Sequence, residues 1–187
     1  MEENLKTLPS KKLEFMDPKK ILDQLQLKEG QVVADFGCGS GHLSLQSSKI
    51  VGKDGQIYAI DIQKPVLETL SSKIRIQGKR NIKVIWANLE IPQASGLPDK
   101  STQLVIMSNI LHLSKHHHNI LREAYRVLTP GGQLLIIEWR ESATPLGKSL
   151  ITRVNGDTIR KEAENAGFSF AKEIKTDEYH HGWLYRK

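Results

Sequence analysis

The residues that decide the fold are Val32-Val33-Ala34-Asp35-Phe36-Gly37-Cys38-Gly39-Ser40-Gly41-His42. The stretch begins with a short apolar run, which is typical of a buried parallel strand. Three glycines then alternate with other residues. They predict a tight turn that a ligand can approach closely, because glycine has no Cβ atom. Apolar residues after His42 predict a short buried helix that ends at Gly52. Strand, glycine turn and helix together predict the ligand crevice of an open α/β sheet.

A second apolar run, Ile57–Ile60, ends in Asp61. A carboxylate at the end of this second strand can accept hydrogen bonds from both hydroxyls of a ribose. The dinucleotide pattern G-x-G-x-x-G requires a small residue at the position that His42 occupies, so the turn does not suit a pyrophosphate. The sequence therefore speaks against an NAD-dependent oxidoreductase.

The pattern Asp-Phe-Gly-Cys-Gly-Ser-Gly at residues 35–41 closely resembles motif I of the class I S-adenosylmethionine (SAM)-dependent methyltransferases. Asp61 and the later run Leu128–Gly132 strengthen the resemblance, which covers about residues 30–140 by motif. It is closest to small stand-alone methyltransferase-domain proteins of the ubiquinone/menaquinone-biosynthesis and arsenite types. The resemblance implies a SAM-dependent methyltransferase with S-adenosyl-L-methionine as its cofactor.

Strands and helices alternate along the chain through five predicted strands, which favours a doubly wound parallel sheet. A helix and two closing strands, Phe168–Ile174 and Gly182–Tyr185, follow. Their short connection makes the last strand antiparallel. Thr129–Gly132 predicts a turn before the fifth strand, and Asp17-Pro18 predicts the start of an N-terminal helix that ends near Leu27. We expect a Rossmann-like α/β fold with a doubly wound sheet of seven strands, mostly parallel with an antiparallel last strand.

The chain is expected to form a single domain, because its length suits one ordinary core and no internal repeat interrupts it. In related methyltransferases an N-terminal segment folds over the cofactor, which makes Phe15 and Met16 candidates for a lid; simple cover for the sheet edge is the alternative reading. The expected parts of the domain 1–187 are an N-terminal arm and helix (1–29, the possible lid), a cofactor-binding core (30–140), and a substrate-side loop, helix and terminal hairpin (141–187).

The resemblance also implies roles for single residues. The glycine turn with Asp35 would hold the amino-acid moiety of the cofactor, Asp61 the ribose hydroxyls, and Asn88 with Leu89 the adenine. Asn88 stands where the family usually has Asp, and its amide oxygen can accept the same hydrogen bond without the charge. The backbone at Asn109 would complete the methionine side. The predicted cofactor-binding residues are Asp35, Gly37, Cys38, Gly39, Gly41, Asp61, Ile62, Asn88, Leu89 and Asn109.

Methyl transfer from a sulfonium has a neutral leaving group, so the protein chiefly supplies proximity and alignment. A general base is needed only if the nucleophile must lose a proton. The catalytic residue stays open at this stage, and a hydrogen-bonded rim residue is the competing reading for each candidate. The pocket candidates, at the ends of the later strands, are His112, Glu138, Arg140, Tyr179 and His180.

Several chemistries are excluded by what the chain lacks. Cys38 is its only cysteine, so an intrachain disulfide and a cysteine metal cluster are ruled out. Arsenic methylation in the resembling family relies on several cysteines, so the resemblance does not extend to arsenic as the acceptor. The run His116–His118 cannot direct three consecutive helical side chains at one ion, and no metal site is predicted. The Asn/Asp-Pro-Pro-aromatic motif of nucleic-acid amino-methyltransferases is absent at Ser108–Leu111.

The net charge is +6, but lysines and arginines are scattered over the whole chain, which favours solvated surface charge over a nucleic-acid patch. No apolar run is long enough for a membrane span, and the N-terminus has no apolar signal core, so a cytoplasmic protein is expected. The predicted partner is a small-molecule acceptor. The alternatives are an RNA or protein methyltransferase, guided by the basic surface, and a non-catalytic SAM-binding module.

Overall fold

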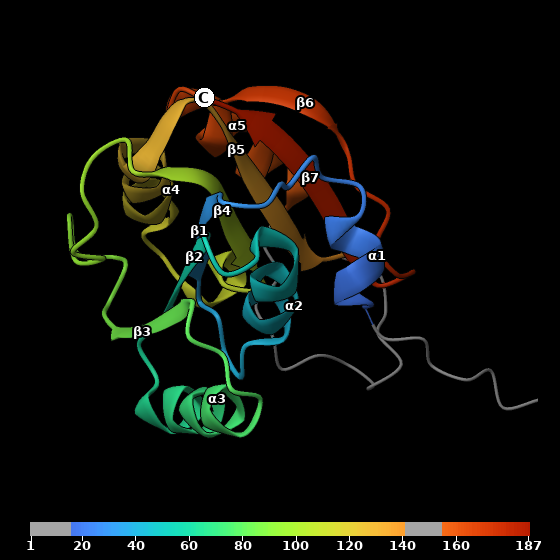
Figure 1. Cartoon of the computed structure of the whole chain (residues 1–187). Coiled ribbons are helices and arrows are strands. Elements are labelled where there is room, and N and C mark those ends of the chain that lie inside the picture. The colour runs from blue at the N-terminus through green and yellow to red at the C-terminus, as the bar shows by residue number, and fades with distance from the viewer. Residues whose placement is uncertain (1–15, 141–154) are drawn as a thin grey trace, which may run out of the picture.

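A single sheet of seven strands organises the molecule, in the order β3-β2-β1-β4-β5-β7-β6 (Figure 1). The computed structural model describes residues 16–140 and 155–187. Neighbouring strands from β1 to β5 are parallel, and β7 runs antiparallel to both β5 and β6. This confirms the predicted fold class. The strands are β1 (Val32–Phe36), β2 (Gln56–Asp61), β3 (Ile82–Trp86), β4 (Thr102–Ser108), β5 (Leu128–Trp139), β6 (Ser169–Glu173) and β7 (His180–Arg186).

Helices cover both faces of this sheet. In Figure 1, α1 and α2 lie in front of the strands and α4 and α5 lie behind them. Apolar side chains of α1, α2 and α3 pack on the front face, and those of α4 and α5 pack on the other. The helical elements are α1 (Pro18–Leu22), α2 (His42–Val51), α3 (Lys64–Ile76), the short 3₁₀ turn η1 (Leu111–Leu113), α4 (His117–Val127) and α5 (Gly156–Asn165).

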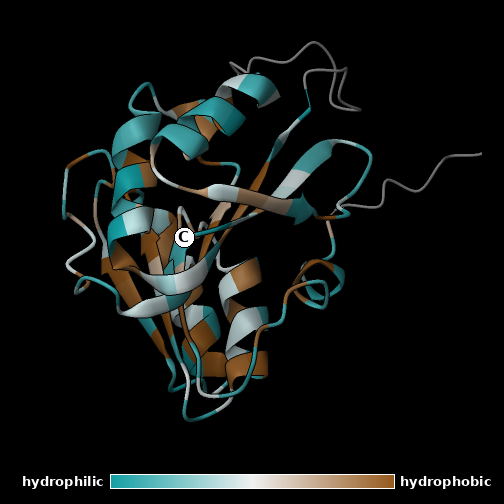
Figure 2. Ribbon diagram, turned by 90° about the horizontal axis from the view of Figure 1, so that it is seen from above, coloured by the Kyte–Doolittle hydropathy of each residue, from teal (hydrophilic) through white to brown (hydrophobic). Residues whose placement is uncertain are grey.

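Burial on both faces explains the uninterrupted apolar run of β4. Residues Leu104–Met107 are all buried, with alternate side chains in the two opposite core clusters. A strand covered on one face only would alternate apolar and polar residues instead. Figure 2 shows brown residues gathered in the central strands, with teal residues on parts of the helices around them. Within the described ranges, no helix has the length and apolar character that a bilayer span requires.

The N-terminal helix starts as predicted but ends earlier. The Asp17 carboxylate accepts the backbone N–H groups of Lys19 and Lys20, at 2.9 and 3.4 Å, which caps the helix start. The helix ends at Leu22 rather than near Leu27, and tighter turns follow. In these turns the Gln24 side chain hydrogen-bonds to the backbone of Lys175, after β6. This long-range contact favours the turns over a continuation of the helix.

The predicted turn at Thr129–Gly132 lies inside β5 rather than before it. Thr102 and Leu104 of β4 pair with Leu128 and Gln133 of β5, so the residues between these partners form a bulge in one long strand. The Gly131 N–H donates to the Lys187 carbonyl, and the Lys187 N–H donates to the Gly132 carbonyl, so both backbone hydrogen bonds hold the bulge. The proline and glycines therefore mark an interruption of the ladder and not the end of the strand. The predicted polar loop 141–152 and Phe15 lie outside the described residues.

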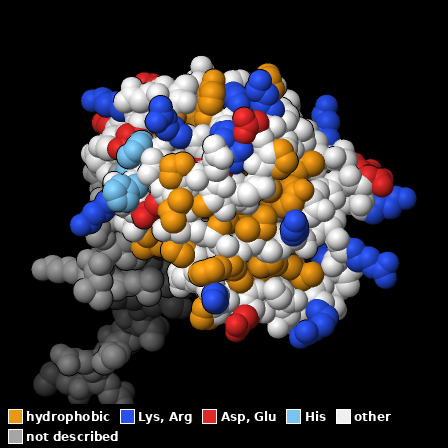
Figure 3. All heavy atoms as spheres, turned by 90° about the vertical axis from the view of Figure 1, so that its left-hand side faces the viewer, with side chains coloured by type: hydrophobic (Ala, Val, Ile, Leu, Met, Phe, Trp, Pro, Cys, Tyr) orange, Lys and Arg blue, Asp and Glu red, His pale blue; other side chains and the backbone are white. Residues whose placement is uncertain are grey.

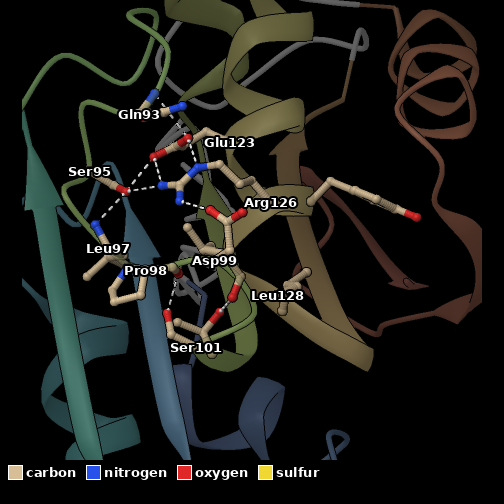
Figure 4. A network of polar contacts seen from close by, with 12 residues as sticks. Gln93, Ser95, Leu97, Pro98, Asp99, Ser101, Glu123, Arg126 and Leu128 are labelled. Atoms are coloured by element: carbon tan, nitrogen blue, oxygen red, sulfur yellow. Dashed lines mark hydrogen bonds and ion pairs between the residues drawn. The ribbon is translucent and has the colours of Figure 1, made fainter.

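A buried ion pair fastens the loop between β3 and β4 onto α4 (Figure 4). Glu123 accepts hydrogen bonds from the backbone of Gln93 at 3.2 Å, from the Ser95 hydroxyl, and from Arg126 Nε at 2.9 Å. Arg126 Nη1 reaches Asp99 at 2.5 Å. Burial raises the pKa of Glu123, but the hydrogen bonds from Arg126 and Ser95 outweigh it and leave that pKa below its ordinary value.

The variant Arg126→Ala leaves Glu123 buried without its cation. We expect it to lower the free energy of unfolding by about 3 kcal/mol, the usual cost of breaking a buried pair. The loss should shrink below about pH 4, because the lowered pKa makes the stabilisation by Glu123 disappear as pH falls. Urea denaturation measures both. The exposed Arg122 of the same helix is the control, and Arg122→Ala should stay within about 0.5 kcal/mol of the parent. Equal losses in both variants would contradict the pairing.

Candidate functional site

The glycine turn after β1 is packed closely on two sides and open on one. Gly37, Gly39 and Gly41 all have positive φ, the conformation that glycine adopts without strain. A Cβ atom on Gly41 would lie 2.2 Å from Leu70 Cδ1, and one on Gly37 would lie 2.8 Å from Ile110 Cδ1. At Gly39 it would meet nothing within 4 Å. The turn therefore fits tightly against α3 and the segment that follows β4, while Gly39 leaves space for a ligand.

A cavity of about 470 Å³ lies at the carboxyl ends of the parallel strands, beside this turn. Most of the residues that the sequence predicts for cofactor binding line this cavity. The carboxyl edge of such a sheet is where ligands bind. The lining residues are Gly37, Gly39, Asp61, Ile62, Gln63, Ala87, Asn88, Leu89, Glu90, Ser108, Asn109, Ile110, Leu113, Ser114 and Ile120.

Asp61 is the buried carboxylate of this cavity, with 7% of its surface exposed. Its Oδ2 accepts the N–H of Gly39 at 2.9 Å, and its Oδ1 accepts the N–H of Gln63 at 2.8 Å. Each carboxylate oxygen can accept a second hydrogen bond. Asp61 therefore fixes the glycine turn to the end of β2 and keeps acceptor capacity for a ligand that presents two hydroxyls.

The segment after β3 contributes Asn88 and an acidic residue that the sequence analysis missed. Asn88 Oδ1 accepts the N–H of Glu90 at 3.0 Å, and Glu90 Oε1 accepts the Ser114 hydroxyl at 2.5 Å. Glu90 is not singled out in the sequence analysis. Its place in the segment that follows the end of β3 is the signal that could have identified it, because residues after strand ends face the crevice. Ser108, Ile110, Leu113 and Ser114 are further lining residues that the pattern did not single out.

Three predicted cofactor residues, Asp35, Cys38 and Gly41, do not line the cavity. Asp35 is buried and accepts the Ser44 hydroxyl at 2.5 Å. Burial raises its pKa to about 6, with the charge of Asp61 adding to the effect and the hydrogen bonds from Ser44 opposing it. Burial also raises the pKa of the Cys38 thiol, which leaves it unsuited to act as a nucleophile.

The predicted acceptor-side residues are not among those that line the cavity. Glu138, at the end of β5, is 2% exposed. Its carboxylate accepts the Leu111 N–H at 2.7 Å and pairs with His112 Nδ1 at 3.0 Å. Glu138 and His112 therefore hold η1, whose neighbours Ile110 and Leu113 do line the cavity. The structure brings this pair together directly behind the wall of the site.

His180 forms a second buried pair, with Asp177, at the start of β7. Its Nδ1 lies 2.6 Å from Asp177 Oδ1, and its Nε2 lies 3.2 Å from Nδ2 of Asn109, a lining residue. The imidazole packs on Trp139, with ring centroids 4.1 Å apart. Tyr179 donates its hydroxyl hydrogen to Glu178 at 2.8 Å.

Arg140 lies elsewhere, in a second cavity of about 470 Å³ between α5 and β7. This cavity shares no lining residue with the first. In residues 16–140 and 155–187, no group of His, Cys, Asp and Glu side chains is placed to hold a metal ion. His117 of the histidine run pairs instead with Glu162 of α5 at 2.9 Å.

Comparison with known proteins gives one consistent family. A model described as a methyltransferase domain matches residues 27–184. The ubiquinone/menaquinone biosynthesis C-methyltransferase UbiE of Citrobacter koseri is 33% identical over 130 residues, which are 68% of this chain and 51% of that protein. UbiE of Neisseria meningitidis is 30% identical over 150 residues, 77% of this chain and 60% of that protein. The chain thus spans only about half the length of these relatives.

Solved structures agree with this result. A SAM-dependent methyltransferase from Aquifex aeolicus superimposes with a TM-score of 0.83 at 29% identity, covering 93% of this chain and 91% of its own. An arsenic(III) S-adenosylmethionine methyltransferase from Chlamydomonas reinhardtii reaches a TM-score of 0.67 at 28% identity, with 86% of this chain and 64% of its own covered.

The raised pKa of Asp35 makes stability depend on pH. A folded pKa of about 6 against an ordinary value of 3.8 means that the folded state binds the proton more tightly, so stability falls as pH rises from about 4 to about 6. Asp35→Asn removes this dependence. Relative to the parent, we expect the variant to gain about 2 kcal/mol of unfolding free energy between pH 4 and pH 8.

Urea denaturation at the two pH values measures this gain. Asp54→Asn, at an exposed position, should show no such difference. If the difference in unfolding free energy between the parent and Asp35→Asn is the same at both pH values, the raised pKa of Asp35 is disproved.

Proposed function

This chain belongs to the class I SAM-dependent methyltransferase family, and we propose that it transfers the methyl group of S-adenosylmethionine to a small-molecule acceptor. The cavity at the open side of the glycine turn, with Asp61 beside it, is the observation that carries the proposal. The UbiE relatives are named as C-methyltransferases of ubiquinone and menaquinone biosynthesis.

The donors and acceptors of the cavity fit the cofactor. Asp61 offers acceptor positions suited to the ribose hydroxyls, and Asn88 retains a lone pair on an amide oxygen that otherwise accepts the Glu90 N–H. Gly39 allows close approach because a Cβ there would project into open space. Apolar contacts from Ile62 and Leu113 suit the flat faces of an adenine ring.

S-adenosylmethionine, when bound, supplies an activated methyl group on a sulfonium with a neutral leaving group. The task of the chain is to bind, to orient and to exclude water. With Asp61 and Asn88 assigned to ribose and adenine, the wall near Gly37 and Asn109 is left for the methionine end. Among the described residues that line the cavity, the titratable ones are Asp61 and Glu90, and both belong to the adenosine side. Alignment rather than proton transfer by a lining residue is therefore the catalytic contribution that we propose.

The surface around the cavity favours a small organic acceptor over RNA. Large apolar side chains are exposed there, with Ile62 54%, Ile91 57% and Leu113 68% accessible, next to Trp86 at 60%. Trp86 is fixed by a hydrogen bond from its indole N–H to the Ile62 carbonyl at 2.8 Å. Figure 3 looks onto this side of the molecule, where apolar side chains gather and cationic ones are spread around them. A phosphate-binding surface would instead cluster its cations.

Cofactor binding is tested by calorimetric titration with S-adenosylmethionine and with S-adenosylhomocysteine. We expect binding in the micromolar range, and a loss of about tenfold or more in Asp61→Ala, because hydrogen bonds to a charged group are removed. The exposed Asp54 provides the control, since Asp54→Ala should bind like the parent. A parent protein that binds neither compound would refute the proposed function.

The class of acceptor is tested by S-adenosylhomocysteine formation from two substrate pools, the small-molecule filtrate of a bacterial extract and RNA purified from the same extract. We expect turnover with the filtrate that changes little between about 50 and about 200 mM salt. Turnover with RNA that collapses over that range would favour the nucleic-acid alternative, because phosphate contacts release counterions. Tight cofactor binding with no turnover on either pool would favour a non-catalytic module.

A further inference from the structure

Asn109 has an unusual backbone conformation for its position in the site. It follows β4 directly and lines the cavity, and its φ is +55°. Side chains other than glycine seldom adopt this left-handed region, and residues held there cluster at functional sites. Its backbone N–H donates to the Ile137 carbonyl at 2.8 Å. The conformation therefore needs surrounding contacts that hold it.

His180 supplies the contact that holds the Asn109 side chain. Asp177 Oδ1 lies 2.6 Å from His180 Nδ1, and a carboxylate can only accept, so the proton of the neutral ring is on Nδ1. Nε2 is then an acceptor, and Nδ2 of Asn109 donates to it across 3.2 Å. Asp177 is itself held in place, because the same oxygen accepts the backbone N–H groups of Tyr179 and His180 at 2.9 and 3.0 Å.

This contact is the polar anchor of the amide. Oδ1 of Asn109 is buried and makes no hydrogen bond within the described chain. The next residue, Ile110, packs so closely on Gly37 that a Cβ atom there would lie 2.8 Å from Ile110 Cδ1. A shift of Asn109 would therefore move the wall that it shares with the glycine turn, and would leave the Asp61 end of the cavity in place.

We infer that Asp177 and His180 are a positioning pair, which holds the backbone of Asn109 so that the cavity can take the amino-acid end of the cofactor. The pair comes from the C-terminal part of the sheet and touches no lining residue of the Asp61 and Asn88 end in the contacts described above. The inference rests on the proposed function, in which that other end binds adenosine.

Two ligands separate the two ends of the cavity. S-adenosylhomocysteine has both adenosine and the amino-acid group, and 5′-methylthioadenosine has adenosine without the amino acid. In His180→Leu, which removes the acceptor, we expect affinity for S-adenosylhomocysteine to fall about tenfold and affinity for 5′-methylthioadenosine to stay within about twofold. His180→Gln places an amide oxygen near the Nε2 position and should restore most of the affinity. His181→Leu, the neighbouring side chain on the other face of β7, is the matched control and should bind both ligands like the parent.

Substitutions at Asn109 test the backbone directly. Asn109→Gly and Asn109→Ala both lose the side-chain contact, but only glycine adopts positive φ without strain. We therefore expect the glycine variant to bind S-adenosylhomocysteine several-fold more tightly than the alanine variant, with thermal unfolding confirming that both are folded.

The inference is overturned if His180→Leu binds S-adenosylhomocysteine like the parent, or if it loses affinity for both ligands equally. It is also overturned if the glutamine variant is as weak as the leucine variant, or if glycine and alanine at position 109 bind alike. A parent protein that binds no S-adenosylhomocysteine refutes the proposed function itself, which is a distinct result.

Discussion

The hydrogen bond from the Gly39 N–H to the Asp61 carboxylate joins the two parts of the molecule on which the site depends. It connects the turn after β1 to the end of β2, and so fixes the open side of the turn relative to a buried charge. That charge is tolerated because backbone N–H groups surround it. The helices on both faces leave the carboxyl edge of the sheet as the place where polar groups of successive strands converge.

Most of the fold could be predicted from the sequence because its causes are local. The buried run of β4, the glycine turn and the Asp17 cap each follow from neighbouring residues. The errors have long-range causes. The first helix ends early where Gln24 contacts the backbone of Lys175, and the turn at Thr129–Gly132 becomes a bulge because strands on both sides pair with β5.

The residues of the site also separate into those that local sequence predicts and those that depend on long-range contacts. Asp61 and Asn88 lie at the ends of strands that apolar runs predict. Both were predicted at the ligand crevice, and both line the cavity. Whether they bind the cofactor stays a prediction. No local pattern indicates that His180 meets Asn109, a contact that spans 71 positions of the sequence. It arises because β7 returns between β5 and β6, and only the three-dimensional order of the strands determines which side chains become neighbours.

The place of β7 also has a consequence for how the molecule is assembled. During synthesis β6 emerges before β7, yet among the described strands β6 pairs with β7 alone. β6 therefore cannot pair with the sheet until β7 has been synthesised. Such non-local pairing slows folding and prolongs the exposure of unpaired strand edges. Since β7 carries His180, the edge of the sheet that forms the cavity reaches its final shape only at this late step. A nascent chain that has completed β1 to β5 would contain the glycine turn and Asp61, with Asn109 still lacking its anchor.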